Sequence, residues 1–262
     1  MRVRATRAAI VAAVLSIPAF PALGQSVLLR LNPEAGLVSR YVTGMETLMD
    51  NPMMPTDQPA MVGQVWSTQT VTSVEGDVVE LEMVTDSADL SMPATPMMES
   101  QLPDMTGMVQ IVKMDSRGRI IEADLGEDPD AQQVSGQMAG MGLQFPEGEV
   151  GPGESWSADI DYDLPGMPGS SMAMSMQLTY TLTEVSSAAG SQFATITFEG
   201  PVVMSGDSGG MGMQASGTTS GTMVFDVTKG RLTGTEMTLV IDIEMAGMAM
   251  AVTQSVHMTL IN

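Results

Sequence analysis

Strict alternation of apolar and polar residues is the feature that most constrains this chain. The stretch TEMTLVIDIEM (235–245) places an apolar residue at every second position from Met237 onward. After Ala246-Gly247, MAMAVTQSVHMTLI (248–261) resumes the alternation, with Gln254 as the one interruption. A period of two is typical of a half-buried β-strand, and Gly247 tolerates the positive φ of a tight turn. The two stretches therefore predict a long terminal β-hairpin.

Two pairs of segments in the chain resemble each other in the same order. Residues 70–84 align with 181–199, and residues 112–125 align with 223–237. In the second pair an Asp precedes a Gly-Arg dipeptide between apolar runs, and this chemistry is typical of a tight turn. The residues of these two turns are Asp115, Gly118 and Arg119, and Asp226, Gly230 and Arg231.

These patterns predict an all-β fold of two tandem, duplicated antiparallel β-meander units, which form curved sheets or a half-barrel. The first unit is expected over residues 25–125 and the second over 153–262. A linker rich in Gly, Pro and acidic residues joins them over 126–152. We expect at most one short helix, near 130–142.

The N-terminus has the composition of a secretory signal peptide. Arg2, Arg4 and Arg7 precede the apolar run AAIVAAVLSIPAF, and small residues follow before Gln25. This pattern predicts residues 1–24 as a signal peptide, with cleavage near Gly24 and an extracytoplasmic location, periplasmic or secreted. Neither this run nor any later one is long and apolar enough for a transmembrane helix, so no transmembrane segment is expected.

The charge of the chain excludes one class of partner. It has 31 acidic and 10 basic residues, a net charge of −21, and no cysteine. A strongly negative protein repels the phosphate backbone, so we expect no nucleic-acid partner. Without cysteine, stability depends on the burial of apolar surface rather than on disulfides.

The turn motifs also carry a resemblance. FPEGEVGPGESW (145–156), YTLTEVSSAAG (180–190) and the two Asp-to-Gly-Arg turns resemble an uncharacterised group of exported bacterial β-rich proteins of unknown function. The resemblance spans most of residues 27–262 and implies an antiparallel sheet. A more distant likeness is to periplasmic lipoprotein carriers, whose curved sheet holds acyl chains.

One motif of serine hydrolases is present, GDSGG at residues 206–210. A nucleophile elbow of this type needs a strand before it and a helix after it, and MGMQASGTTSG is not a helical sequence. A trypsin-like protease would need a histidine upstream of Ser208, whereas the one histidine is His257. We therefore expect no catalytic residues and no enzymatic activity.

A metal site is not expected either. Asp159, Asp161 and Asp163 alternate along one stretch, but a calcium loop of the EF-hand type would need Gly and Glu where Leu164 and Ser170 stand. A solvated strand face is the simpler interpretation, and we expect no cofactor.

The chain contains 28 methionines, and SSMAMSMQLTY places three of them at alternate positions. Methionine on an alternating apolar face is most simply packing, because its flexible thioether fills irregular space. We expect an apolar interior that packs on itself or holds a lipid or other hydrophobic ligand. Its predicted lining is Met172, Met174, Met176, Met237, Met245, Met248 and Met250. Methionines in proline-rich loops are expected to close over it as a lid, namely Met53, Met54, Met97 and Met98.

Two alternatives stay open from the sequence. Thioethers also select Cu(I) and Ag(I), so the chain could be a soft-metal-binding protein of the cell envelope. It could equally be a structural envelope component with no small ligand. The sequence leaves the oligomeric state open.

Overall fold

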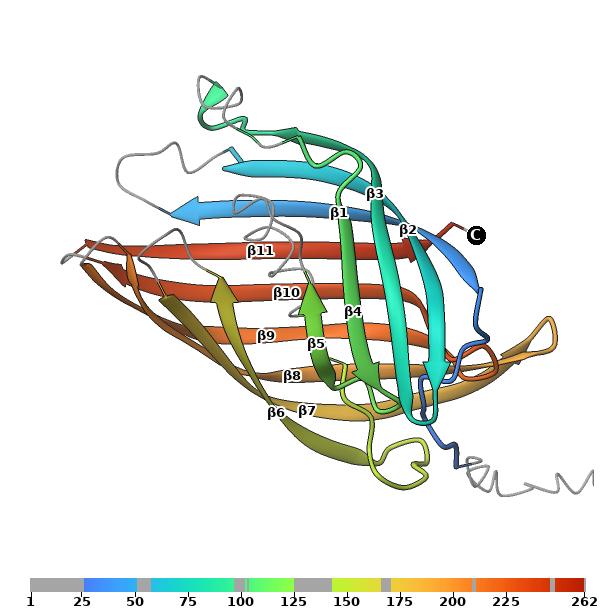
Figure 1. Cartoon of the computed structure of the whole chain (residues 1–262). Helices are drawn as coiled ribbons and strands as arrows, with labels where there is room; N and C mark the ends of the chain where they lie inside the picture. Colours follow the sequence, from blue (N-terminus) through green and yellow to red (C-terminus); the bar gives the residue numbers. More distant parts are fainter. Residues whose placement is uncertain are drawn as a thin grey trace, which may run out of the picture.

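The computed structural model is an antiparallel β-sheet of eleven strands (Figure 1). The described residues are 26–50, 58–96, 102, 104–124, 143–165, 171–208, 211–245 and 248–261. The strands are β1 (Val38–Asp50), β2 (Met61–Glu75), β3 (Val78–Ser91), β4 (Val109–Asp115), β5 (Ile120–Asp124), β6 (Ser155–Pro165), β7 (Ser171–Ala188), β8 (Ser191–Ser208), β9 (Met211–Asp226), β10 (Arg231–Met245) and β11 (Met248–Leu260).

All strands belong to one open, curved sheet with the order β5-β4-β3-β2-β1-β11-β10-β9-β8-β7-β6. Consecutive strands pair throughout β1–β5 and throughout β6–β11, whereas β5 does not pair with β6. The two sets of strands are connected by the pairing of β1 with β11. The sheet thus consists of two meanders, β1–β5 and β6–β11. They are joined where the first strand of the chain, β1, lies beside the last strand, β11. Strands β5 and β6 form the two edges.

The prediction of an all-β, antiparallel fold is confirmed. The predicted terminal hairpin is present as β10–β11, with Met245 opposite Met248. The β7–β8 hairpin turns at Ala189 and Gly190, which both have positive φ, 51° and 83°, as a two-residue type I′ turn requires. The helix predicted near 130–142 lies outside the described residues.

The two meanders begin with the same backbone hydrogen bonds. The N–H of Gly36 donates to the carbonyl of Val71 (2.8 Å), and the N–H of Gly153 donates to that of Leu182 (2.7 Å). Val71 and Leu182 each donate in return to the residue after the glycine, both at 3.0 Å. Both glycines have positive φ, 83° and 87°.

A β-bulge follows at the same place in each meander. The register shifts at Thr72 in β2 and at Thr183 in β7. Each threonine hydroxyl donates to a carbonyl of the next strand, Thr72 to Glu80 at 3.2 Å and Thr183 to Thr195 at 2.9 Å. Bulges bend a strand and increase its twist, so both meanders curve at corresponding positions.

The main core lies over β6–β10, on one face of the sheet. We call this face of the whole sheet the inner face. Strand β7 contributes alternate buried residues, Met176, Leu178, Tyr180 and Leu182. The alternation explains the burial, because successive side chains of a strand point to opposite faces. The intervening Gln177 and Thr179 are exposed.

Two irregular segments cover this core, and we call them the first lead-in (residues 26–37, before β1) and the second lead-in (residues 143–154, before β6). They pair with each other through two hydrogen bonds between Val27 and Val150, of 2.9 and 3.0 Å. Leu29 and Phe145 have no exposed surface, and the ring of Phe145 meets that of Phe225 edge-on at 4.7 Å. The lead-ins therefore supply part of the core themselves.

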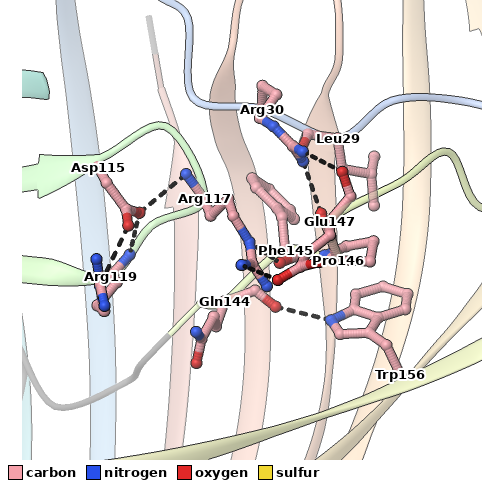
Figure 2. A network of polar contacts seen from close by, with 10 residues as sticks. All are labelled: Leu29, Arg30, Asp115, Arg117, Arg119, Gln144, Phe145, Pro146, Glu147 and Trp156. Atoms are coloured by element: carbon pink, nitrogen blue, oxygen red, sulfur yellow. Dashed lines mark hydrogen bonds and ion pairs between the residues drawn. The ribbon is translucent and has the colours of Figure 1, made fainter. Parts of the chain in front are cut away.

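Arginine side chains fasten the second lead-in from two sides (Figure 2). Arg30 donates to the carbonyls of Pro146 (2.7 Å) and Glu147 (2.6 Å). Arg117, in the turn between β4 and β5, donates from Nε to the carbonyl of Phe145 (2.8 Å). The second lead-in is not part of the β-sheet, so its backbone carbonyls lack the hydrogen bonds of a neighbouring strand. The two guanidinium groups supply hydrogen bonds to these carbonyls and so hold the segment in place.

No helix within the described ranges is long and apolar enough to cross a membrane.

Candidate functional site

A cavity of about 230 Å³ lies between the first lead-in and the inner faces of β1–β4 and β9–β11. Its walls are mostly aliphatic and thioether side chains. They include Leu31, Val71, Leu81, Met83, Met114 and Met258. Both halves of the sheet contribute, so the cavity exists because β1 and β11 are neighbours.

Three polar side chains of the cavity wall form a connected group. Arg231, the first residue of β10, donates from Nη1 to Oγ of Ser39 in β1 at 2.6 Å. The hydroxyl of Tyr41 donates to the carbonyl of Leu232 at 3.0 Å. All three side chains line the cavity, and Ser39 and Tyr41 are buried.

Burial raises the pKa of Tyr41 above its ordinary value of 10.0. A hydrogen bond from Ser39 and the charge of Arg231 oppose that rise. The phenol of Tyr41 is uncharged at neutral pH, as that of an ordinary tyrosine is, so Tyr41 does not supply a counter-charge to Arg231.

Two residues that line the cavity each have a buried polar atom without a hydrogen-bond partner among the described residues. These atoms are Nε of Arg231 and Oγ1 of Thr235. A buried donor without a partner costs free energy, more so when the group is charged. Within the described lining, Arg231 also provides the one charged side chain.

Arg231 differs from its counterpart in the other Gly-Arg turn. Arg119 is paired with Asp115, Nε to Oδ2 at 3.2 Å, and its side chain is 70% exposed. Asp226, the counterpart of Asp115, instead accepts from the backbone N–H of Lys229 at 3.0 Å. Over the part of the chain that the structure describes, no carboxylate forms an ion pair with Arg231.

The structure places several of the predicted lining methionines on the inner face, but not in this cavity. Met176 is buried in the main core, and Met174 and Met237 pack against that core half-buried. Met250 is half-buried opposite Ile243.

The other predicted methionines are not described in the same detail. Backbone pairing places Met172 opposite Gly206, and Met245 opposite Met248. The side chains of Met172, Met245 and Met248 lie outside what the structure describes. The whole of the predicted lid, Met53, Met54, Met97 and Met98, also lies outside the described residues.

The methionines that do line the cavity belong mainly to other stretches. They are Met83, Met114, Met223 and Met258. Met83 and Met114 have the same alternation as the predicted set, in EMV and KMD, but their runs are shorter. The sequence analysis also did not predict Arg231 as a cavity residue. Arg119 and Arg231 follow the same turn motif, so nothing in the local sequence distinguishes one from the other.

Ser208 and His257 are not brought together. Ser208 ends β8 and pairs with Met211 at the start of β9, so a strand follows it and not a helix. The register from β9 through β10 to β11 puts Ser208 at the Met248 end of the sheet. His257 is nine positions further along β11, which corresponds to roughly 30 Å at about 3.3 Å per residue.

His257 lies instead beside Glu236 on the outer face. Its Nδ1 is 3.5 Å from Oε1 of Glu236, and both side chains are mostly exposed. Its Nε2 is 2.9 Å from the hydroxyl of Thr259. Among the described residues, no group of three or more His, Cys, Asp or Glu side chains is arranged to hold a metal ion.

Comparison with protein families gives one match. Residues 121–232 match a family of unknown function, DUF6263. The match covers β5 to the start of β10 and includes Arg231. It agrees with the resemblance to an uncharacterised β-rich group that the turn motifs indicated. No curated protein matches the chain.

Solved structures resemble the chain only weakly. A hypothetical lipoprotein, YmcC from Escherichia coli, has a TM-score of 0.26 at 11% identity, over 85% of this chain and 84% of that one. OmpT, an outer membrane protein of Vibrio cholerae in a trimer form, has a TM-score of 0.18 at 7% identity, over 87% and 100%. Scores of this size carry no argument about function.

Proposed function

We propose that this chain is a non-enzymatic, extracytoplasmic protein that binds a small apolar molecule in the cavity between its two meanders. The observation that carries the proposal is the cavity of about 230 Å³ with its mainly apolar wall. A wall that is mainly apolar favours the uptake of apolar molecules. Each Å² of apolar ligand surface removed from water contributes roughly 25 cal/mol.

The size of the cavity limits the ligand. Pockets for drug-sized molecules have volumes of roughly 300–1,000 Å³, and this cavity is smaller, about 230 Å³. The fitting ligand is therefore a short apolar molecule or the end of an acyl chain. The extracytoplasmic location rests on the signal-peptide pattern of residues 1–24.

The interlocked lead-ins support a binding role with a preformed site. The first lead-in provides Leu31, Pro33 and Leu37 to the wall, and the second provides Leu143. Both are held by backbone hydrogen bonds to the β4–β5 turn, Leu31 N–H to Ser116 O at 2.7 Å and Phe145 N–H to Arg117 O at 2.8 Å. A wall that is fixed before binding reduces the ordering cost of the ligand complex.

Titration with the neutral, environment-sensitive dye N-phenyl-1-naphthylamine tests the proposal. We expect saturable fluorescence enhancement that octanol reverses by competition. Ser67→Phe, which adds a ring to the cavity wall, should abolish it. Ser87→Phe adds the same ring at an exposed position of β3 and should leave it unchanged. Enhancement that is equal in both variants would place the dye elsewhere and overturn the proposal.

The proposal that the chain is not an enzyme has its own test. A fluorophosphonate probe should leave Ser208 unlabelled, because the register separates it from His257. Labelling of Ser208 that disappears in His257→Ala would show that a hydrolase site exists after all.

A further inference from the structure

The cavity wall contains a cation that the fold does not neutralise. Arg231 enters a mainly apolar wall, in a chain whose net charge is −21. Within the described ranges it pairs with no carboxylate, although 31 acidic residues are available in the chain. The side chain of Arg231 is half-buried, and a charge partly withdrawn from water is unfavourable unless a partner compensates it.

The free hydrogen-bonding edge of Arg231 is the one that suits an anion. Nη1 is bound to Ser39, whereas Nε is buried and has no partner in the described part of the chain. Nε and Nη2 share one edge of the planar guanidinium, and this edge binds a carboxylate through two parallel hydrogen bonds. The Ser39 contact fixes the guanidinium plane and so orients that edge.

Comparison of the two Gly-Arg turns argues against a purely local role. The turn motif alone would pair the arginine with the preceding aspartate, as Arg119 pairs with Asp115 at 3.2 Å. In the second turn the aspartate, Asp226, is 2% exposed and bonded to the backbone of Lys229. The same motif thus leaves one arginine neutralised at the surface and directs the other to the cavity.

We propose that Arg231 binds the anionic head of an amphipathic ligand whose tail occupies the apolar part of the cavity. The inference rests on the proposed function and specifies the ligand class, a small molecule with a carboxylate or similar anionic group and an alkyl tail. Thr235, whose buried hydroxyl also lacks a described partner, supplies a second polar contact on the same wall. Leu31, Leu81 and Met114 provide apolar surface for the tail.

Calorimetric titration of the purified protein with octanoate, octanol and acetate separates the contributions of head and tail. Octanoate should bind roughly tenfold to a hundredfold more tightly than octanol, the range expected for a charge-assisted hydrogen bond. Acetate, which has the head without the tail, should bind far more weakly than either. Arg231→Met should abolish most of the difference between octanoate and octanol affinity, because it removes the group that distinguishes the two heads.

Arg119→Met is the matched control, because it removes the equivalent arginine from the exposed turn. It should alter neither affinity. Arg231→Lys keeps the charge but loses the forked geometry, and should retain part of the preference for octanoate. Thermal unfolding of each variant identifies any that does not fold, and the comparison of the three ligands on the unsubstituted protein does not depend on the variants.

The outcomes separate this inference from the proposed function. Equal affinity for octanoate and octanol in the unsubstituted protein would overturn the role of Arg231 while the apolar site stands. No binding of either eight-carbon ligand, together with no binding of the neutral dye, would overturn both. An octanoate preference that persists in Arg231→Met would place the anion at another group and also overturn the inference.

Discussion

Gly118 and Gly230 occupy the same place in two hairpins, and each lies against the lead-in of the opposite meander. A Cβ on Gly118 would come 2.3 Å from the carbonyl oxygen of Leu143, in the second lead-in. A Cβ on Gly230 would come 2.5 Å from the backbone nitrogen of Asn32, in the first. Each meander therefore packs its turn against the segment that begins the other, which interlocks the two.

Substitution of either glycine should reveal this contact. Gly118→Ala and Gly230→Ala combine a positive φ, 87° and 63°, with a clash against backbone. We expect each to lower the free energy of unfolding by about 2–4 kcal/mol, as measured by urea denaturation.

Gly76→Ala is the matched control for that experiment. Gly76 also has a positive φ, 62°, but nothing lies within 4 Å of its added Cβ. It should cost only the backbone strain, about 1 kcal/mol. If all three variants lose the same stability, the packing of the turns on the lead-ins contributes nothing.

The guanidinium of Arg30 leads to a second prediction. It donates to the carbonyls of Leu29, Pro146 and Glu147 at 2.6 to 2.7 Å. Arg30→Met should lower the free energy of unfolding by about 1–2 kcal/mol, the range of charged hydrogen bonds reduced for partial exposure. Amide exchange at Val150, whose N–H donates across the lead-ins, should accelerate.

Arg40, exposed on β1, provides the comparison for Arg30. Arg40→Met should change the free energy of unfolding by less than about 0.5 kcal/mol. Equal effects of the two substitutions would mean that the carbonyl contacts of Arg30 do not stabilise the lead-ins.

The turn chemistry and the alternation were sufficient to predict strands, hairpins and the antiparallel class. Asp115 and Asp226 each precede a glycine with positive φ, as their motifs predicted. The pairing of β1 with β11 was not predictable in the same way. A local pattern indicates which side chains face inward, but it does not specify which distant strand lies alongside.

The cavity was beyond the reach of the sequence for the same reason. Met83 and Met258 line the same cavity only because the two meanders join through β1 and β11. Arg119 pairs within its own turn with Asp115, whereas Arg231 binds Ser39, which is distant from it in sequence. The periodicity of the sequence predicts which residues lie on the apolar face of each strand. The position of the cavity on that face depends on which distant strands pair, and the sequence pattern does not specify this.

The raised pKa of Tyr41 predicts a pH dependence of stability. In the unfolded chain Tyr41 ionises near pH 10.0, whereas in the folded chain burial keeps the phenol protonated to higher pH. Its contribution is therefore fully present below pH 10 and is lost as the pH rises through the folded pKa. Tyr41→Phe removes this dependence together with the hydrogen bond to Leu232.

The measurement is the difference in free energy of unfolding between the unsubstituted protein and Tyr41→Phe across pH 8 to 11.5. At pH 8 the unsubstituted protein should be more stable by about 1 kcal/mol, the net value of one hydrogen bond. The difference should shrink above pH 10, where the unfolded state of the unsubstituted protein ionises. A difference that stays constant over the whole range would mean that Tyr41 has the same pKa in both states.

Replacement of Met172, Met174 and Met176 together by Leu distinguishes packing from soft-metal binding. Met176 is 6% exposed in the main core, and Met174 pairs across β7 and β8 with Met204. Leu and Met have similar volumes, so each swap should cost less than about 1.5 kcal/mol. Replacement of all three by Ser should be far more damaging, because it buries a hydroxyl without an assured partner at a core position such as 176.

Cu(I) titration of the triple-Leu variant against a competing chelator completes the test. Packing predicts that the variant folds and that neither protein holds Cu(I) against the chelator. Met45→Leu, at a buried position of a different cluster, controls for general loss of thioethers. Thioethers select Cu(I) and leucine has the shape without the sulfur. A tight stoichiometry that is present in the unsubstituted protein and in Met45→Leu, but absent from the folded triple variant, would therefore assign these methionines to a metal site.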